Sequence, residues 1–161
     1  MNATRFILIA LFALTASARA CAGEAQGQVT LGGSKFSMNV ANAFLEDTGG
    51  GKPTTLVLLT EGPVDLSSEL ASPDPYFDLI NDKAIAAVAW VAVFIEGKHV
   101  SVNAHKAGDE TQYFASQKFG LDATVSGGGN APIEGKLHLG GSGTSMQIDV
   151  NFKTDMLKAG S

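Results

Sequence analysis

The feature that most constrains the fold is a period-two alternation of apolar and polar residues between glycine-rich turns. In the segment "SMQIDVNFK", Met146, Ile148, Val150 and Phe152 alternate with polar residues. Successive side chains of a strand point to opposite faces, so this pattern predicts a strand with one buried face. Nineteen glycines supply turns along the 161-residue chain. "GKLHL" and the alternating segment are therefore expected to form a hairpin that closes the domain.

Similar patterns predict strands along most of the chain. The segment "TTLVLLT", Thr54–Thr60, is apolar on both faces, so we expect an interior strand that is covered on each side. Gly97 and Lys98 separate "VAVFIE" from "HVSVNAH" and predict a hairpin with a two-residue turn. Alternation also runs from Val29 to Val40 around the turn Gly32-Gly33-Ser34, and from Lys118 to Val125 before "SGGGNAP"; Gly49, Gly50 and Gly51 predict a flexible loop.

One helix is predicted to begin at "DPYFDLINDKAIAAVA". Asp74 suits the N-cap, and Pro75 suits the first helical position. Seven to nine short strands with one short α-helix predict a mainly β fold, either an antiparallel β-sandwich or an open barrel. The buried face of the helix is expected to carry Phe77, Ile80, Ala84 and Val88.

The N-terminus has the three-part layout of a secretory signal peptide. Arg5 precedes an apolar run from Phe6 to Leu14, and Ala18-Arg19-Ala20 matches a cleavage pattern. We therefore expect a signal peptide over residues 1–20, a flexible tether over 21–27 and a single β-rich domain over 28–158. The protein is expected to be exported, either periplasmic or secreted.

Cys21, the only cysteine, follows the cleavage pattern directly. "SARAC" resembles a bacterial lipobox, whose cysteine receives a lipid, although Ala18 and Arg19 depart from the usual residues. Two alternatives stay open: a lipid anchor on Cys21, or ordinary cleavage that leaves Cys21 in a solvated terminus.

Charge excludes several classes of partner. The net charge is −5, and no run of Lys or Arg occurs, so we expect no binding to nucleic acid or to an anionic lipid surface. A membrane-spanning helix needs roughly 20 consecutive apolar residues. No segment after residue 20 supplies them, so we expect no transmembrane segment in the mature chain.

The stretch "GKHVSVNAHKAGDE" contains two of the three histidines and invites a metal-site hypothesis. In a strand, His99 and His105 share the polar face, but six residues separate them by roughly 20 Å, too far to share one zinc ion. We expect these two and His138 to be solvated. Asp74, Asp78 and Asp82 recur every four residues on the predicted helix, where capping and the helix dipole explain them without a cation.

Catalytic templates do not match. In "GGGKP", Pro53 stands where a phosphate-binding loop needs Ser or Thr, and "GGSGT" places Thr144 outside the nucleophile-elbow pattern. We expect no catalytic residue, no cofactor and no metal, and we favour a non-enzyme. A triad assembled from distant residues stays open.

Two segments, "LGGSKFSM" and "LGGSGTSM", agree at six of eight positions. Either shared turn chemistry or a duplicated hairpin explains them.

The segment "VANAFLEDTGGGKPTTLVLLTEGPVDLSS" resembles exported bacterial proteins of unassigned function, in which an A-x-A-F strand precedes the pattern V-x-L-T-x-x-P-x-D. The resemblance implies a small envelope β domain and supplies no active site. The matching residues are Ala41, Ala43, Phe44, Val57, Leu59, Thr60, Pro63 and Asp65.

The leading interpretation is a non-catalytic envelope domain that binds a protein or a polymer through its loops or a strand edge. The alternative is a carrier of a small apolar ligand in an internal pocket. An enzyme with dispersed residues is a third hypothesis. A solid core with an exposed apolar edge favours the binding module.

Overall fold

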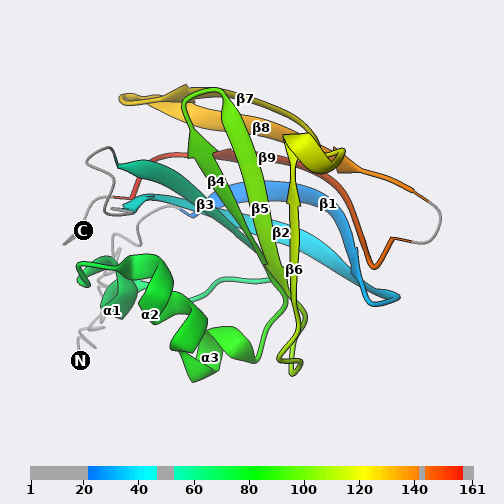
Figure 1. Cartoon of the computed structure of the whole chain (residues 1–161). Coiled ribbons are helices and arrows are strands. Elements are labelled where there is room, and N and C mark those ends of the chain that lie inside the picture. Colours follow the sequence, from blue (N-terminus) through cyan, green and yellow to red (C-terminus); the bar gives the residue numbers. More distant parts are fainter. Residues whose placement is uncertain (1–21, 47–52, 142–143, 158–161) are drawn as a thin grey trace, which may run out of the picture.

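The computed structural model describes residues 22–46, 53–141 and 144–157, and within these ranges nine strands form one antiparallel sheet that curls into a half-barrel (Figure 1). The strand order is β6-β5-β4-β3-β2-β1-β9-β8-β7. This confirms the mainly β fold, in its open-barrel form. The strands are β1 Gly23–Leu31, β2 Ser34–Glu46, β3 Thr54–Thr60, β4 Trp90–Glu96, β5 His99–His105, β6 Gln112–Ser116, β7 Asp122–Gly128, β8 Ala131–Leu139 and β9 Met146–Thr154.

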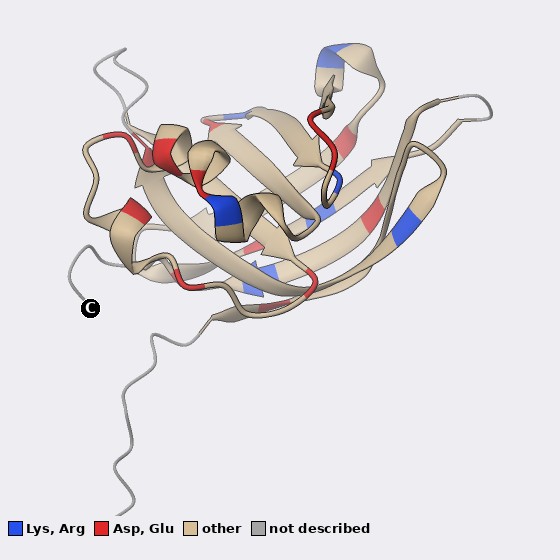
Figure 2. Ribbon diagram, turned by 90° about the horizontal axis from the view of Figure 1, so that it is seen from below, with Lys and Arg blue, Asp and Glu red and all other residues tan. Residues whose placement is uncertain are grey.

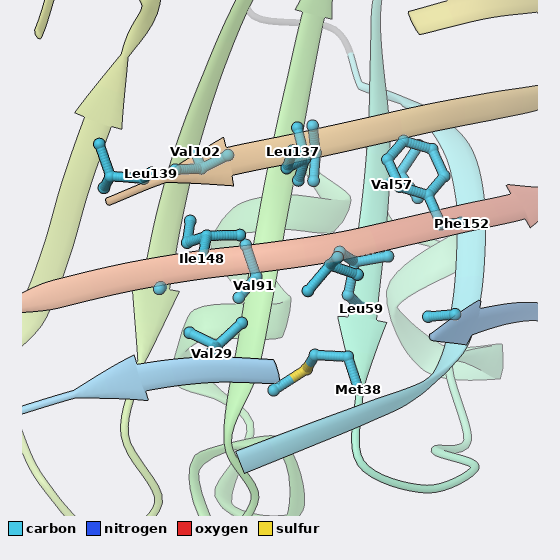
Figure 3. Packing of buried hydrophobic residues seen from close by; sticks show 14 of the residues in the cluster. Val29, Met38, Val57, Leu59, Val91, Val102, Leu137, Leu139, Ile148 and Phe152 are labelled. Carbon is cyan, nitrogen blue, oxygen red and sulfur yellow. The ribbon is translucent and has the colours of Figure 1, made fainter. Parts of the chain in front are cut away.

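The main core fills the inside of the curled sheet. Side chains of β8 and β9 point toward those of β3, β4 and β5, as Figure 3 shows for Leu137 and Ile148 opposite Val91. The alternation predicted for β9 is confirmed, since every second residue from Met146 to Phe152 is buried. The predicted pairing of β8 with β9 and of β4 with β5 is also confirmed.

A second core lies between the outer face of the sheet and three short helices. These are α1 Ser67–Leu70, α2 Pro75–Asn81 and α3 Lys83–Ala86, which lie together below the sheet in Figure 1. Leu79 and Ile85 of the helices pack with Trp90 of the sheet in this cluster. In β3, Val57 belongs to the inner core and Leu58 to the outer core, which confirms the strand covered on each side.

The predicted helix begins where expected, and its end, which the sequence left open, lies at Asn81, after which α3 follows. The Asp74 carboxylate accepts a hydrogen bond from the Phe77 amide at 3.0 Å. At Asp82 the backbone is extended (φ −74°, ψ 129°), and its carboxylate caps α3 through the amides of Ala84 and Ile85, at 2.6 and 2.9 Å. The expected buried face was wrong at Phe77, which is 58% exposed, and at Ala84, which is also exposed. Ile80 and Val88 are partly buried.

The expected tether at residues 21–27 was wrong from Gly23 onward, because Gly23–Gly27 belongs to β1. This strand pairs with both β2 and β9 and is central in the sheet. A Cβ atom on Gly23 or Gly27 would collide with the backbone of β9, so these glycines permit close strand contact rather than flexibility. The expectations for the signal peptide, Cys21 and the loop at Gly49–Gly51 fall outside the described residues.

The structure differs from the predictions in three further places. Phe119 lies in a 3₁₀ helix, η1 Gln117–Phe119, which ends at Gly120 in the left-handed region (φ 87°), so β7 begins only at Asp122. The strand β6 was not predicted. In β2 the side chain of Met38 faces the inner core, and so does that of Ala41 three residues later, which breaks the alternation of a regular strand. The pairing of β1 with β2 changes register between these two residues.

The two similar segments mark neighbouring hairpins. Leu31 pairs with Met146, and the Gly32 amide donates to the Ser145 carbonyl at 2.8 Å. The structure thus places both glycine-rich connections at the same end of the sheet.

Candidate functional site

The predicted histidine stretch forms β5, and its apolar side is buried as expected at Val100, Val102 and Ala104. His99 is exposed, and His138 on β8 is exposed as predicted. The prediction was wrong for His105, which is 8% exposed. Its ring stacks on Trp90 with centroids 5.4 Å apart, and its Nε2 lies 3.0 Å from the Ala86 carbonyl oxygen.

A polar network anchors α2 beside this histidine. The Asn103 amide donates to the Tyr76 hydroxyl at 2.6 Å and to Oε1 of Gln112 at 2.8 Å. The buried Glu46 carboxylate accepts from the Tyr76 amide at 2.9 Å. Burial raises the pKa of the Tyr76 hydroxyl, and the Glu46 charge adds to this, while the Asn103 hydrogen bond acts in the opposite direction. The network is a structural anchor built from largely internal partners.

The acids of the predicted carboxylate stripe have separate structural roles. Asp74 caps α2 and Asp82 caps α3, while Asp78 lies in the first turn of α2. Over the part of the chain that the structure describes, no three His, Cys, Asp or Glu side chains are grouped to hold a metal ion. Figure 2 shows the acidic positions spread over helices, loops and strands, with fewer basic positions among them.

The candidate functional site is the edge of the sheet at β6, "QYFAS". This strand pairs only with β5 among the described strands, so its other side is open for backbone hydrogen bonds. Phe114 of β6 is 62% exposed, and Phe119 of η1 is 72% exposed. Their rings meet edge to face, with centroids 6.4 Å apart. The edge therefore carries two large apolar side chains in water.

The opposite edge, β7, is built differently. Its exposed residues include the acid Asp122, and its register with β8 shifts between Ser126 and Gly128. Gly127 and Gly128 have φ values of 90° and 98°, which distort the end of the strand. Charges and bulges are devices that keep edge strands from pairing with other chains. The five residues of β6 contain no charge, no proline and no register shift.

Side chains hold β6 and its neighbours in place. Oε1 of Gln117 accepts from the Val100 amide at 3.1 Å, and its Nε2 lies 3.5 Å from the Ala123 carbonyl oxygen, so this residue links β5 to β7. Tyr113 packs on the inner core, and its hydroxyl lies next to Gly32 in the β1–β2 turn. These contacts join the edge to the inner core and to β7.

Sequence reasoning missed this site because β6 is only five residues long. Its two adjacent aromatic residues, Tyr113 and Phe114, were the available signal. Aromatic residues favour strands, and one of two neighbours in a strand must face away from the core.

The inside of the half-barrel holds a large cluster of buried apolar side chains, and the carrier hypothesis stays a prediction. Hollows open on the surface of the described part of the chain. One, of about 780 Å³, is lined mainly by polar residues and lies on the outer face of β1, β2, β7, β8 and β9. Another, of about 570 Å³, is mainly apolar and lies between the helices and the residues Phe44, Leu45 and Leu157.

No helix among the described residues is long and apolar enough to cross a membrane.

Comparison of the chain with protein-family models, with curated proteins and with solved structures finds no match.

Proposed function

We propose that this protein is a non-catalytic binding module that adds an extended segment of a partner polypeptide to its sheet at β6. The observation that carries the proposal is the contrast between the two edges. The strand β7 is distorted and bears an acid, whereas β6 is uncharged, carries the exposed Phe114 and is followed by the exposed Phe119 of η1. In this mode of recognition the backbone supplies hydrogen bonds, and alternate side chains supply specificity.

The chemistry of the edge defines the partner segment. Five residues at about 3.4 Å each give a pairing length of roughly 17 Å. Side chains on the face of Phe114 and Phe119 are expected to be aromatic or β-branched, since such cross-strand pairs stabilise a sheet. Asp109 and Glu110 precede β6, and hydrogen bonds from Thr111 lower the pKa of Asp109, which keeps it ionised. A basic residue is therefore favoured near that end of the partner.

A displayed library of random ten-residue peptides tests the proposal. Peptides selected on the immobilised protein are measured against three variants: Phe114→Lys, Phe119→Lys and the control Phe77→Lys. Phe77 is exposed to a similar extent but lies on α2. We expect the selected peptides to have alternating apolar residues. Their affinity for each edge variant should be at least tenfold lower than for the wild type, and their affinity for the control should be unchanged.

Three outcomes contradict the proposal. The library yields no binder, or its binders tolerate both edge variants, or the protein alone forms a dimer that Phe114→Lys dissolves. In the last case a second copy occupies the edge in place of a partner.

We also propose that the protein is exported to the cell envelope, as the sequence of residues 1–20 favours, with a lipid on Cys21 as an alternative to a free terminus. Mass spectrometry of the protein purified from its native envelope tests both. A chain that keeps residues 1–20 contradicts export, and an unmodified Cys21 contradicts the anchor.

A further inference from the structure

We infer that the polar hollow on the outer face of the sheet is a second binding site, for a neutral polyhydroxylated chain such as an oligosaccharide. It has a volume of about 780 Å³ and lies on the five neighbouring strands β7, β8, β9, β1 and β2. Ligand sites commonly have volumes of about 300–1,000 Å³. The site is independent of the β6 edge.

The hollow is floored by two rows of outward-facing side chains that cross the strands. With a spacing of about 4.8 Å between strands, a row over four strands is roughly 14 Å long, which suits an extended ligand. Strand pairing places one residue of each row on each strand: Thr124, Lys136, Asn151 and Gln26 in the first row, and Ser126, Glu134, Lys153 and Glu24 in the second.

The hydrogen-bonding groups of the hollow are available to a ligand. Among the described residues, Gln26, Asn151, Thr124 and Ser126 have no side-chain hydrogen bond to the protein, although all four line the hollow. Amides and hydroxyls both donate and accept, as sugar hydroxyls do. Asn39, which also lines the hollow, is bonded within the protein instead, to the carbonyl oxygens of Ser37 and Glu61. Outside the hollow, side-chain amides are bonded within the protein at Asn81, Asn103, Gln112, Gln117 and Gln147, whereas Gln28 has no side-chain hydrogen bond to another described residue.

The charges of the hollow favour a neutral ligand. Lys153 and Glu134 form an ion pair at 2.6 Å, and this hydrogen bond is the main reason why the pKa of Lys153 is raised. Glu24 and Lys136 are the remaining charges of the two rows, so the rows are balanced. The whole chain has a net charge of −5, which repels an anionic polymer.

The test is an NMR titration of the isotope-labelled protein with neutral hexasaccharides of α-glucose, β-glucose and N-acetylglucosamine, and with hexagalacturonate as the anionic comparison. The variant is Gln26→Ala. The matched control is Gln28→Ala, two residues away on the same strand and face but outside the hollow.

We expect at least one neutral oligosaccharide to shift the amide signals of β8, β9 and β1. Gln26→Ala should weaken the binding of that oligosaccharide about fivefold, as for the loss of one hydrogen bond. Gln28→Ala and Phe114→Lys should leave binding unchanged. The inference is overturned if no neutral member shifts these signals, if both glutamine variants behave alike, or if hexagalacturonate binds more tightly. Failure here leaves the proposal for β6 standing, because the site and the probe differ.

Discussion

The imidazole of His105 lies almost parallel to the indole of Trp90, at an interplanar angle of 19°, and its Nε2 reaches the carbonyl oxygen of Ala86. This contact joins β5 and β4 to the end of α3. A histidine on the polar face of a strand thus becomes part of the packing between the sheet and the helices.

His105→Ala is expected to lower the free energy of unfolding by about 1–3 kcal/mol, because the ring contact and one hydrogen bond are lost. His99→Ala, on the same strand and face but exposed, is the control and should change stability by less than about 0.5 kcal/mol. Urea unfolding followed by tryptophan fluorescence measures both. Equal effects of the two variants would contradict the described role of His105.

Tyr76→Phe is expected to alter the alkaline branch of the stability profile. The folded state raises the pKa of this hydroxyl above its ordinary value of 10.0, so the folded protein binds its proton more tightly than the unfolded chain does. The associated stability is present below pH 10 and is lost as the pH rises through the folded pKa. The wild type should therefore lose more stability than Tyr76→Phe between pH 9 and pH 11, as measured by denaturant unfolding at each pH. If the stability of the wild type and that of Tyr76→Phe fall in parallel with pH, the raised pKa of Tyr76 is refuted.

Gly135→Ala is expected to destabilise the protein by about 1–3 kcal/mol through overpacking. Gly135 on β8 lies opposite Phe152 on β9, and an added Cβ atom would meet the buried Phe152 ring. At Gly62 an added Cβ atom meets nothing within 4 Å, so Gly62→Ala is the matched control. Thermal unfolding should separate the two variants by several degrees, and an unchanged midpoint for Gly135→Ala would count against the packing described.

Gln117→Ala should loosen the open side of the half-barrel. The Val100 amide loses its side-chain acceptor, at an expected cost of about 1–2 kcal/mol. Hydrogen exchange at Val100 should become faster in this variant and stay unchanged in Lys118→Ala, which alters the neighbouring exposed residue. Unchanged exchange in both variants would show that Gln117 does not hold β5.

Local patterns in the sequence predicted the strands because the period of two is a local property. The alternation in Met146–Phe152 and the two buried faces of Thr54–Thr60 were both readable without any knowledge of neighbouring strands. The burial of His105 was not readable, since it depends on where α3 packs. Likewise, glycines near Gly23 look flexible in the sequence and serve close strand contact in the fold.

The candidate site was less predictable than the fold. The exposure of Phe114 depends on β6 being the last strand of the sheet, which is set by the order of all nine strands. The rows of the polar hollow likewise join residues from both ends of the chain, such as Gln26 and Asn151. No spacing within one segment encodes either arrangement.

The central claim is that β6 accepts another strand, and hydrogen exchange of its backbone amides tests it most directly. The exchange rates of Gln112–Ser116 are to be measured by NMR with and without a saturating peptide selected from the random library. We predict that outward-facing amides of β6 exchange at least tenfold more slowly in the complex, while those of β7 keep their rates. Unchanged rates along β6, or protection confined to other strands, would contradict the account.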